Sequence, residues 1–98
     1  MSDPVILINS FEVPIMDAES FITAWEKVRD YLQTQPGYLD TTLHQSFTPD
    51  AEFQFVNVAH WRIADDFTAT TRSPGFRVAA AGLAGYRAHP ALYRPART

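Results

Sequence analysis

The stretch FVNVAHW (residues 55–61) carries a carboxamide and an indole in an otherwise apolar run. Successive side chains of a β-strand alternate between its faces, so Phe55, Asn57 and Trp61 share one face and His60 lies on the other. At about 3.3 Å per residue, Asn57 and Trp61 lie about 13 Å apart, close to the length of a fused polycyclic aromatic molecule. This pattern indicates a pocket for an aromatic ligand. The alternative is a core tryptophan beside an asparagine that bonds a neighbouring backbone group.

His44 and Arg77 carry a titrating group and a fixed positive charge elsewhere in the chain. Histidine titrates near neutral pH and can move a proton, whereas arginine stays cationic. The plainer alternatives are a histidine that faces solvent at a strand end and an arginine in a surface ion pair. His44, His60 and His89 lack the spacing of metal ligands, so we expect no metal site.

Hydrophobic periodicity, broken by glycine and proline, divides the chain into the elements that must position these residues. Asp17 is expected to cap the first helix, and Pro36 with Gly37 to end it. Ser73 and Pro74 are expected to begin the last helical segment. The predicted elements are strands over 5–13, 39–47 and 53–61, helices over 18–32, 64–71 and about 74–82, and a short closing strand at HPALYRP (89–95).

This order, β-α-β-β-α-β, predicts a ferredoxin-like α+β fold in which helices cover one face of a four-stranded antiparallel sheet. The strands carry large apolar residues on both sides, so the second face needs a cover as well. Two sheets that pack face to face in a homodimer would provide it. We therefore expect a dimeric α+β barrel built from one domain, residues 1–98.

Composition limits the classes of function. The chain has no cysteine, which excludes disulfides and thiol catalysis. We see no signal peptide and no membrane-spanning run, so a soluble, cytoplasmic protein without membrane contact is expected. All eleven acidic residues lie in residues 1–66, whereas residues 67–98 carry five arginines and no acid. These arginines are either solvated side chains or a positive lip for an anionic small molecule, and they are too scattered for a nucleic-acid patch.

The segments PGYLDTTLHQS, FVNVAHWRIADDF and SPGFRVAAAGL resemble the antibiotic biosynthesis monooxygenase family, and the resemblance spans about residues 5–93. The motif Asn57-x-x-x-Trp61 matches the family's asparagine and tryptophan. His44 and Arg77 fall where members that oxidise anthrones carry a pocket histidine and a pocket arginine. Those members have a tyrosine where this chain has Phe67. The resemblance implies a small dimeric barrel that oxidises an aromatic polyketide with O2 and without a cofactor.

The resemblance also implies a role for each residue. O2 reacts slowly with closed-shell molecules unless the substrate is an electron-rich anion, so the protein would form that anion and stabilise the charge that moves onto oxygen. His44 would move the proton and Arg77 would hold a phenolate or superoxide. Asn57 would bind a carbonyl or peroxide oxygen, and Trp61 would stack on the substrate. Further substrate contacts are expected from three phenylalanines: Phe55, Phe67 and Phe76.

Two alternatives to oxygenation stay open. Related dimeric barrels bind or degrade haem, and this chain resembles them at Asn9, but residues 67–82 lack the tryptophan and the ligand histidine that haem binding needs. The second alternative is a non-redox role, either ligand binding or a cyclase-type reaction in the same pocket. Phe67 keeps that role open because it lacks the hydroxyl of the family's tyrosine.

Overall fold

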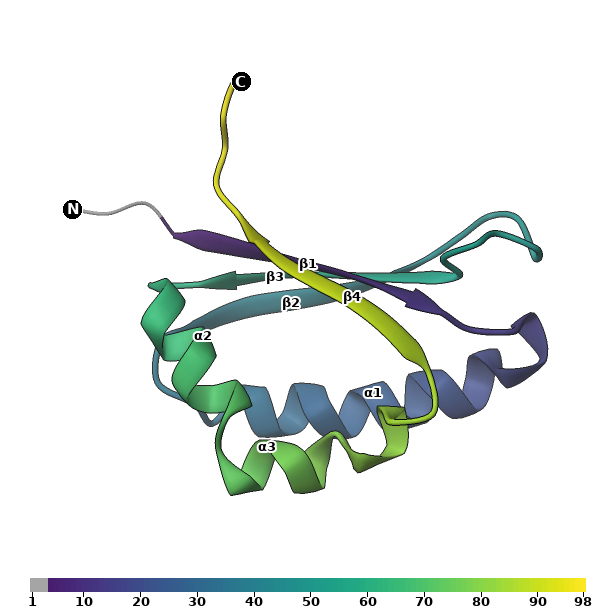
Figure 1. Ribbon diagram of the computed structural model, residues 1–98, viewed down its shortest axis with the longest axis horizontal. Helices are drawn as coiled ribbons and strands as arrows, with labels where there is room; N and C mark the ends of the chain where they lie inside the picture. The colour runs from purple at the N-terminus through teal and green to yellow at the C-terminus, as the bar shows by residue number, and fades with distance from the viewer. Residues whose placement is uncertain (1–3) are drawn as a thin grey trace.

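The computed structural model, which describes residues 4–98, is an antiparallel sheet with helices on one face (Figure 1). The order of its four strands is β2-β3-β1-β4, so β1 and β3 are central. The elements are β1 (Val5–Glu12), η1 (Ile15–Asp17), α1 (Ala18–Leu32), β2 (Tyr38–Gln45), β3 (Phe55–Trp61), α2 (Ala64–Thr71), α3 (Pro74–Ala79), η2 (Ala81–Leu83) and β4 (Arg87–Tyr93). The predicted ferredoxin-like α+β fold is confirmed.

Strand register sorts the side chains of the sheet into two faces. Asn9 of β1 lies opposite Asn57 of β3, and Leu43 of β2 lies opposite Asn57 from the other side. Ala59 and Trp61, which follow Asn57 at intervals of two, are fully buried. Asn9, Asn57 and Trp61 therefore share the face that the helices cover.

Helix α1 holds the sheet through the apolar stripe that its periodicity predicts. Four of its residues are buried: Phe21, Trp25, Val28 and Leu32. Phe21 stacks on Phe55 of β3, with ring centroids 4.7 Å apart. Asp17 occupies the N-cap position of α1 as expected, but its carboxylate makes no capping bond and accepts instead from the Tyr86 hydroxyl at 3.3 Å.

The turn at Gly37 ties the start of β2 to α2. Its φ of 83° lies in the left-handed region that glycine adopts without strain. The Gly37 carbonyl accepts from the backbone N–H of Arg62 at 2.8 Å, and Arg62 also donates to Asp66 of α2 at 2.9 Å. A Cβ at position 37 would collide with the Asp66 carboxylate. The close approach of this turn to α2 therefore depends on glycine.

The hairpin between β2 and β3 is wider than predicted. The ladder ends at Gln45 and Phe55, where the sequence suggested 47 and 53, because the buried side chain of Gln54 holds the loop. Its Nε2 donates to the carbonyls of Thr48 at 3.0 Å and Pro49 at 3.3 Å. The segment predicted as one helix over 74–82 divides into α3 and η2, and the closing strand begins at residue 87 rather than 89.

The face of the sheet away from the helices has an aliphatic centre with polar groups around it. Ile8 of β1 and Val58 of β3 lie opposite each other there and are half-buried. All three histidines of the chain belong to this face by register: His44, His60 and His89. His60 lies 2.6 Å from Asp40, and His89 lies 2.7 Å from Glu12. The large apolar residues that the strands carry on this side are therefore only half covered within one protomer.

Candidate functional site

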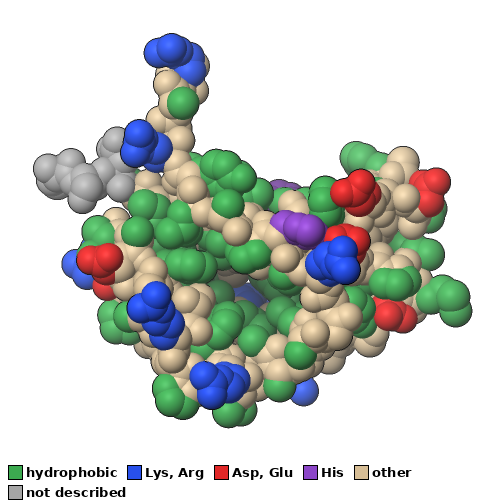
Figure 2. All heavy atoms as spheres, in the orientation of Figure 1, with side chains coloured by type: hydrophobic (Ala, Val, Ile, Leu, Met, Phe, Trp, Pro, Cys, Tyr) green, Lys and Arg blue, Asp and Glu red, His purple; other side chains and the backbone are tan. Residues whose placement is uncertain are grey.

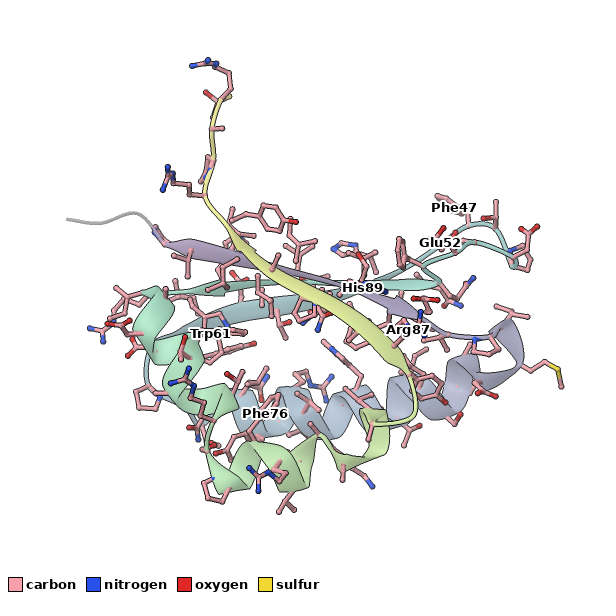
Figure 3. The ribbon with its side chains drawn as sticks, viewed as in Figure 1. Phe47, Glu52, Trp61, Phe76, Arg87 and His89 are labelled. Carbon is pink, nitrogen blue, oxygen red and sulfur yellow. The ribbon has the colours of Figure 1, made fainter. Side chains whose placement is uncertain are left out.

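A cavity of about 580 Å³ lies between the helix-covered face of the sheet and the helical layer. Its walls come from β1, β3, β4, α1, α2, α3 and η2. Figure 2 shows the molecule hollowed between β4 and the helices, and Figure 3 shows Trp61 and Phe76 directed into this space. Three small side chains widen the side of α3, η2 and β4: Ala80, Ala84 and Ala88. The cavity is therefore mostly apolar and large enough for a ligand of several fused rings.

Two polar atoms of the cavity walls are buried without a partner. Trp61 is 0% exposed, and its Nε1–H has no acceptor within residues 4–98. The Oδ1 of Asn9 likewise has no donor in this part of the chain. A buried polar group without a partner costs about 1–3 kcal/mol, so both atoms are disposed to bond a ligand that enters the cavity.

Asn57 is a further polar residue of the cavity walls, and one end of its carboxamide is already occupied. The residue is 5% exposed, and its Oδ1 accepts a hydrogen bond of 2.5 Å from the hydroxyl of Thr41. The Nδ2 group is the remaining end, and it can only donate. Because Asn9 and Asn57 are directly opposite in register, their side chains stand next to each other on the cavity wall.

Aromatic rings hold Trp61 in place at one end of the cavity. Phe67 of α2 meets it edge to face with ring centroids 5.7 Å apart, and Tyr38 does so at 5.8 Å. Burial raises the pKa of Tyr38, and the nearby Asp40 raises it further, against an opposing effect of Arg29. Trp61 is therefore fixed in orientation, with its indole buried at this end of the cavity.

The structure brings together four of the seven site residues that the sequence suggests. Asn57, Trp61, Phe67 and Phe76 line the same cavity. Phe55 is on the same face but lies beyond the cavity, where it packs against Phe21 in the core.

His44 and Arg77 do not line this cavity, so the expectation that they do is not met within one protomer. His44 lies opposite Val56, which places it on the other face of the sheet, where it is exposed. Arg77 follows Phe76 on α3, and a helix turns by about 100° per residue, so Arg77 is exposed on the outside when Phe76 points inward.

Asn9 is the functional candidate that residue-by-residue reasoning missed, since it entered only through the resemblance to haem-binding barrels. A signal was nevertheless present. Asn9 is an asparagine in the middle of an apolar strand. If that strand pairs with β3, half of the possible registers place the asparagine on the same face of the sheet as Asn57. The observed register, Asn9 opposite Asn57, is the one that brings the two amides together.

The walls of the cavity contain no Asp, Glu, Lys, Arg or His among residues 4–98. Positive charge lies outside it, because Arg72 and Arg77, both exposed, directly follow the wall residues Thr71 and Phe76. Figure 2 shows basic side chains over the helices beside the hollow and acidic ones gathered at the hairpin end. The site can therefore bind an aromatic molecule and stabilise negative charge through neutral donors, but it offers no general base of its own.

Comparison with known proteins gives a family-model match over residues 4–82, to a family described as antibiotic biosynthesis monooxygenase. A proposed monooxygenase from Shewanella loihica PV-4 has a solved structure that is 45% identical, with a TM-score of 0.87 over 100% of this chain and 99% of that chain. Among curated protein sequences, none matches the chain with significance.

Two further solved structures share the fold at lower identity. One is SnoaB from Streptomyces nogalater, described as a cofactor-independent oxygenase. A variant of it with one asparagine replaced by alanine is 24% identical, with a TM-score of 0.82 over 99% of this chain and 97% of that chain. The other is a proposed antibiotic biosynthesis monooxygenase from Nitrosomonas europaea, 16% identical, with a TM-score of 0.80 over 98% and 93%. Within the part of the chain that the structure describes, no helix is both long and apolar enough to cross a membrane.

Proposed function

Because the chain belongs to the antibiotic biosynthesis monooxygenase family, we propose that it is a cofactor-independent monooxygenase that oxidises an aromatic, polyketide-like phenol or anthrone to a quinone with O2. The observation that carries the proposal is the apolar cavity with buried, unpartnered polar atoms on its walls. The relative SnoaB, described as a cofactor-independent oxygenase, supports the class of chemistry.

The overall reaction that we propose converts a ring CH2 and O2 into a ring C=O and water. The anthrone first loses a proton to give a phenolate-type anion. This anion passes one electron to O2, and the resulting radical pair combines to a peroxide at the same carbon. Loss of water from the peroxide, with the second C–H proton, leaves the carbonyl. One oxygen atom of O2 enters the quinone and the other leaves as water.

The protein's part in this reaction is to bind and stabilise the anion. The Asn57 Nδ2 group and the Trp61 Nε1–H are donors that stabilise negative charge on the substrate oxygen, in a mostly apolar cavity. Because the cavity walls in residues 4–98 carry no ionisable side chain, the proton leaves to solvent, and the donors favour its loss by lowering the pKa of the bound phenol. Phe67 and Phe76 hold the rings. The proposal gives no role to His44, Arg77 or Phe55.

We place a second copy of the chain on the sheet face that carries Ile8 and Val58. Their half-buried side chains would complete a core between two sheets. Sedimentation at micromolar concentration is expected to give twice the 11.0 kDa mass of the chain, and Val58→Lys is expected to give the single mass. A wild-type protein that sediments as a monomer would remove the dimer from the proposal. The expected cytoplasmic location stays a prediction.

The test of the oxygenase uses 1,8-dihydroxyanthrone as substrate, with and without O2. Mass spectrometry with ¹⁸O2 is expected to show one labelled atom in the quinone, formed faster than in the protein-free control. Asn57→Ala is expected to lower the rate about 100-fold, as for the loss of one oxyanion donor. Gln33→Ala removes an exposed carboxamide near the end of α1 and is the matched control. Quinone formation at the uncatalysed rate, or a fully active Asn57→Ala variant, would refute the proposal.

The second candidate is a non-redox role in the same cavity, either binding or a cyclase-type reaction. The observation that favours it is the lack of an ionisable side chain on the described cavity walls. Tight binding of the anthrone without O2 uptake would support this role. O2 uptake equal to the quinone formed would exclude it.

A further inference from the structure

We propose that Thr41 is a positioning residue that makes Asn57 a hydrogen-bond donor toward the cavity. Thr41 does not itself line the cavity. Its hydroxyl donates to Asn57 Oδ1 at 2.5 Å, and this bond leaves the NH2 end of the carboxamide for the ligand. The catalytic part of the inference rests on the proposed oxygenase function, whereas the geometric part does not.

The position of Thr41 in the sheet explains how the bond forms. Thr41 lies opposite Ala59, so it is the diagonal neighbour of Asn57, two residues along on the same face. Diagonal neighbours in an antiparallel pair lie within reach of each other's side chains. Thr41 is half-buried and Asn57 is buried, so little water competes for this bond.

The orientation of Asn57 decides the sign of its interaction with the substrate. The terminal torsion of asparagine is broad and nearly two-fold, so the side chain by itself does not select which end faces the cavity. With Oδ1 held by Thr41, the NH2 group is directed at the ligand and stabilises an oxyanion. With the amide reversed, a carbonyl oxygen would face the ligand and repel the same charge. In the observed arrangement Thr41 occupies the acceptor end of the carboxamide and leaves its donor end for the ligand.

Three variants isolate the hydroxyl of Thr41. Thr41→Val removes the hydroxyl at nearly constant shape, and valine is well suited to a strand. Thr41→Ser restores the hydroxyl without the methyl group. Thr42→Val makes the same exchange one residue away on the opposite face of β2, where the side chain is exposed, and is the matched control.

The first measurement reads the ionisation of a bound ligand that cannot be oxidised. The visible absorbance of 1,8-dihydroxyanthraquinone reports the fraction present as phenolate. Wild-type protein is expected to lower the ligand's apparent pKa on binding. Thr41→Val is expected to bind the phenolate about tenfold more weakly while its affinity for the neutral phenol changes less than twofold. Thr41→Ser is expected to recover the wild-type ratio of the affinity for the phenolate to the affinity for the neutral phenol. Thr42→Val is expected to retain that ratio.

The second measurement needs no ligand. The side-chain NH2 signals of Asn57 in a ¹⁵N-correlated spectrum are assigned by their loss in Asn57→Ala, and Thr41→Val is expected to shift them while Thr42→Val leaves them in place. Unchanged signals in Thr41→Val, or a phenolate-to-phenol ratio equal to that of the wild type, would overturn the inference. If the wild type binds the quinone but does not oxidise the anthrone, the proposed function fails and Thr41 keeps its role. If the quinone does not bind, the NH2 signals alone decide.

Discussion

Replacing Trp61 by phenylalanine separates its contribution to ligand binding from its contribution to stability. Trp61 is 0% exposed and is held edge to face by Tyr38 and Phe67, so a smaller ring loses packing. We expect that loss to cost about 1–2 kcal/mol, since part of an aromatic ring is removed from a site that already borders a cavity. The substitution also removes a buried N–H without a partner, which relieves about 1–3 kcal/mol. The free energy of unfolding should therefore lie between about 1 kcal/mol below and about 2 kcal/mol above that of the wild type.

Ligand binding should respond differently from stability. In the complex the indole N–H gains an acceptor, and a hydrogen bond of this kind contributes about 1 kcal/mol. Its loss in Trp61→Phe corresponds to about a fivefold weaker affinity for 1,8-dihydroxyanthraquinone. Urea denaturation followed by circular dichroism gives the stability, and titration calorimetry gives the affinity.

The second tryptophan of the chain supplies the control. Trp25 is buried and also borders the cavity, but its indole nitrogen is not among the buried, unpartnered atoms. Trp25→Phe should therefore lower the free energy of unfolding, because it removes packing but no buried, unpartnered N–H. It should change the affinity less than Trp61→Phe does. If Trp61→Phe costs more than about 3 kcal/mol of stability and leaves the affinity unchanged, Trp61 is a core residue and the reasoning is wrong.

Three further predictions concern single residues. Asn9→Leu should raise the free energy of unfolding by about 1–2 kcal/mol, because it removes an acceptor that has no partner, and should weaken quinone binding; an unchanged or lower stability by urea denaturation would contradict this. Because burial raises the folded-state pKa of Tyr38 above 10.0, the stability that its neutral form supports is present below pH 10.0 and is lost as the pH rises through the folded pKa. Tyr38→Phe should flatten this decline of stability with pH. If the free energies of unfolding of the two proteins fall in parallel from about pH 9 to 11, the prediction is refuted. Gly37→Ala should destabilise by about 2 kcal/mol, because it combines a left-handed φ with a collision, whereas Gly85→Ala, in open space, should change stability by less than about 0.5 kcal/mol.

The fold was predictable because local patterns and overall architecture agree. The alternation in β3 assigned Asn57 and Trp61 to one face, and that assignment does not depend on how the strand pairs. The apolar stripe of α1 was predictable for a similar reason, because helical periodicity within one segment determines it. The hairpin was less predictable, because the buried amide of Gln54 reorganises the loop, and no pattern marks a polar side chain that will be buried.

The site was predictable where it depended on one strand and unpredictable where it depended on register. The face of His44 depends on how β2 pairs with β3, and the register shifts between Tyr38 and Asp40, so counting from the turn gives no dependable answer. Arg77 is a different case. Its neighbour Phe76 is the natural inward residue of α3, and helical periodicity alone would have placed the arginine outside.

The polar residues that the sheet contributes to the cavity and the small residues of its walls lie on different parts of the fold. Asn9, Asn57 and Trp61 belong to the two central strands, which are paired on both sides and buried beneath α1. The alanines at positions 80, 84 and 88 belong to β4 and to the segments that follow α3 and η2, at the margin of the molecule. Enlarging an alanine at the margin would change the shape of the space while the hydrogen-bonding groups stay on rigid strands. Proteins with this fold can therefore come to accept ligands of different size and shape through substitutions at the margin of the molecule, and still retain one kind of chemistry.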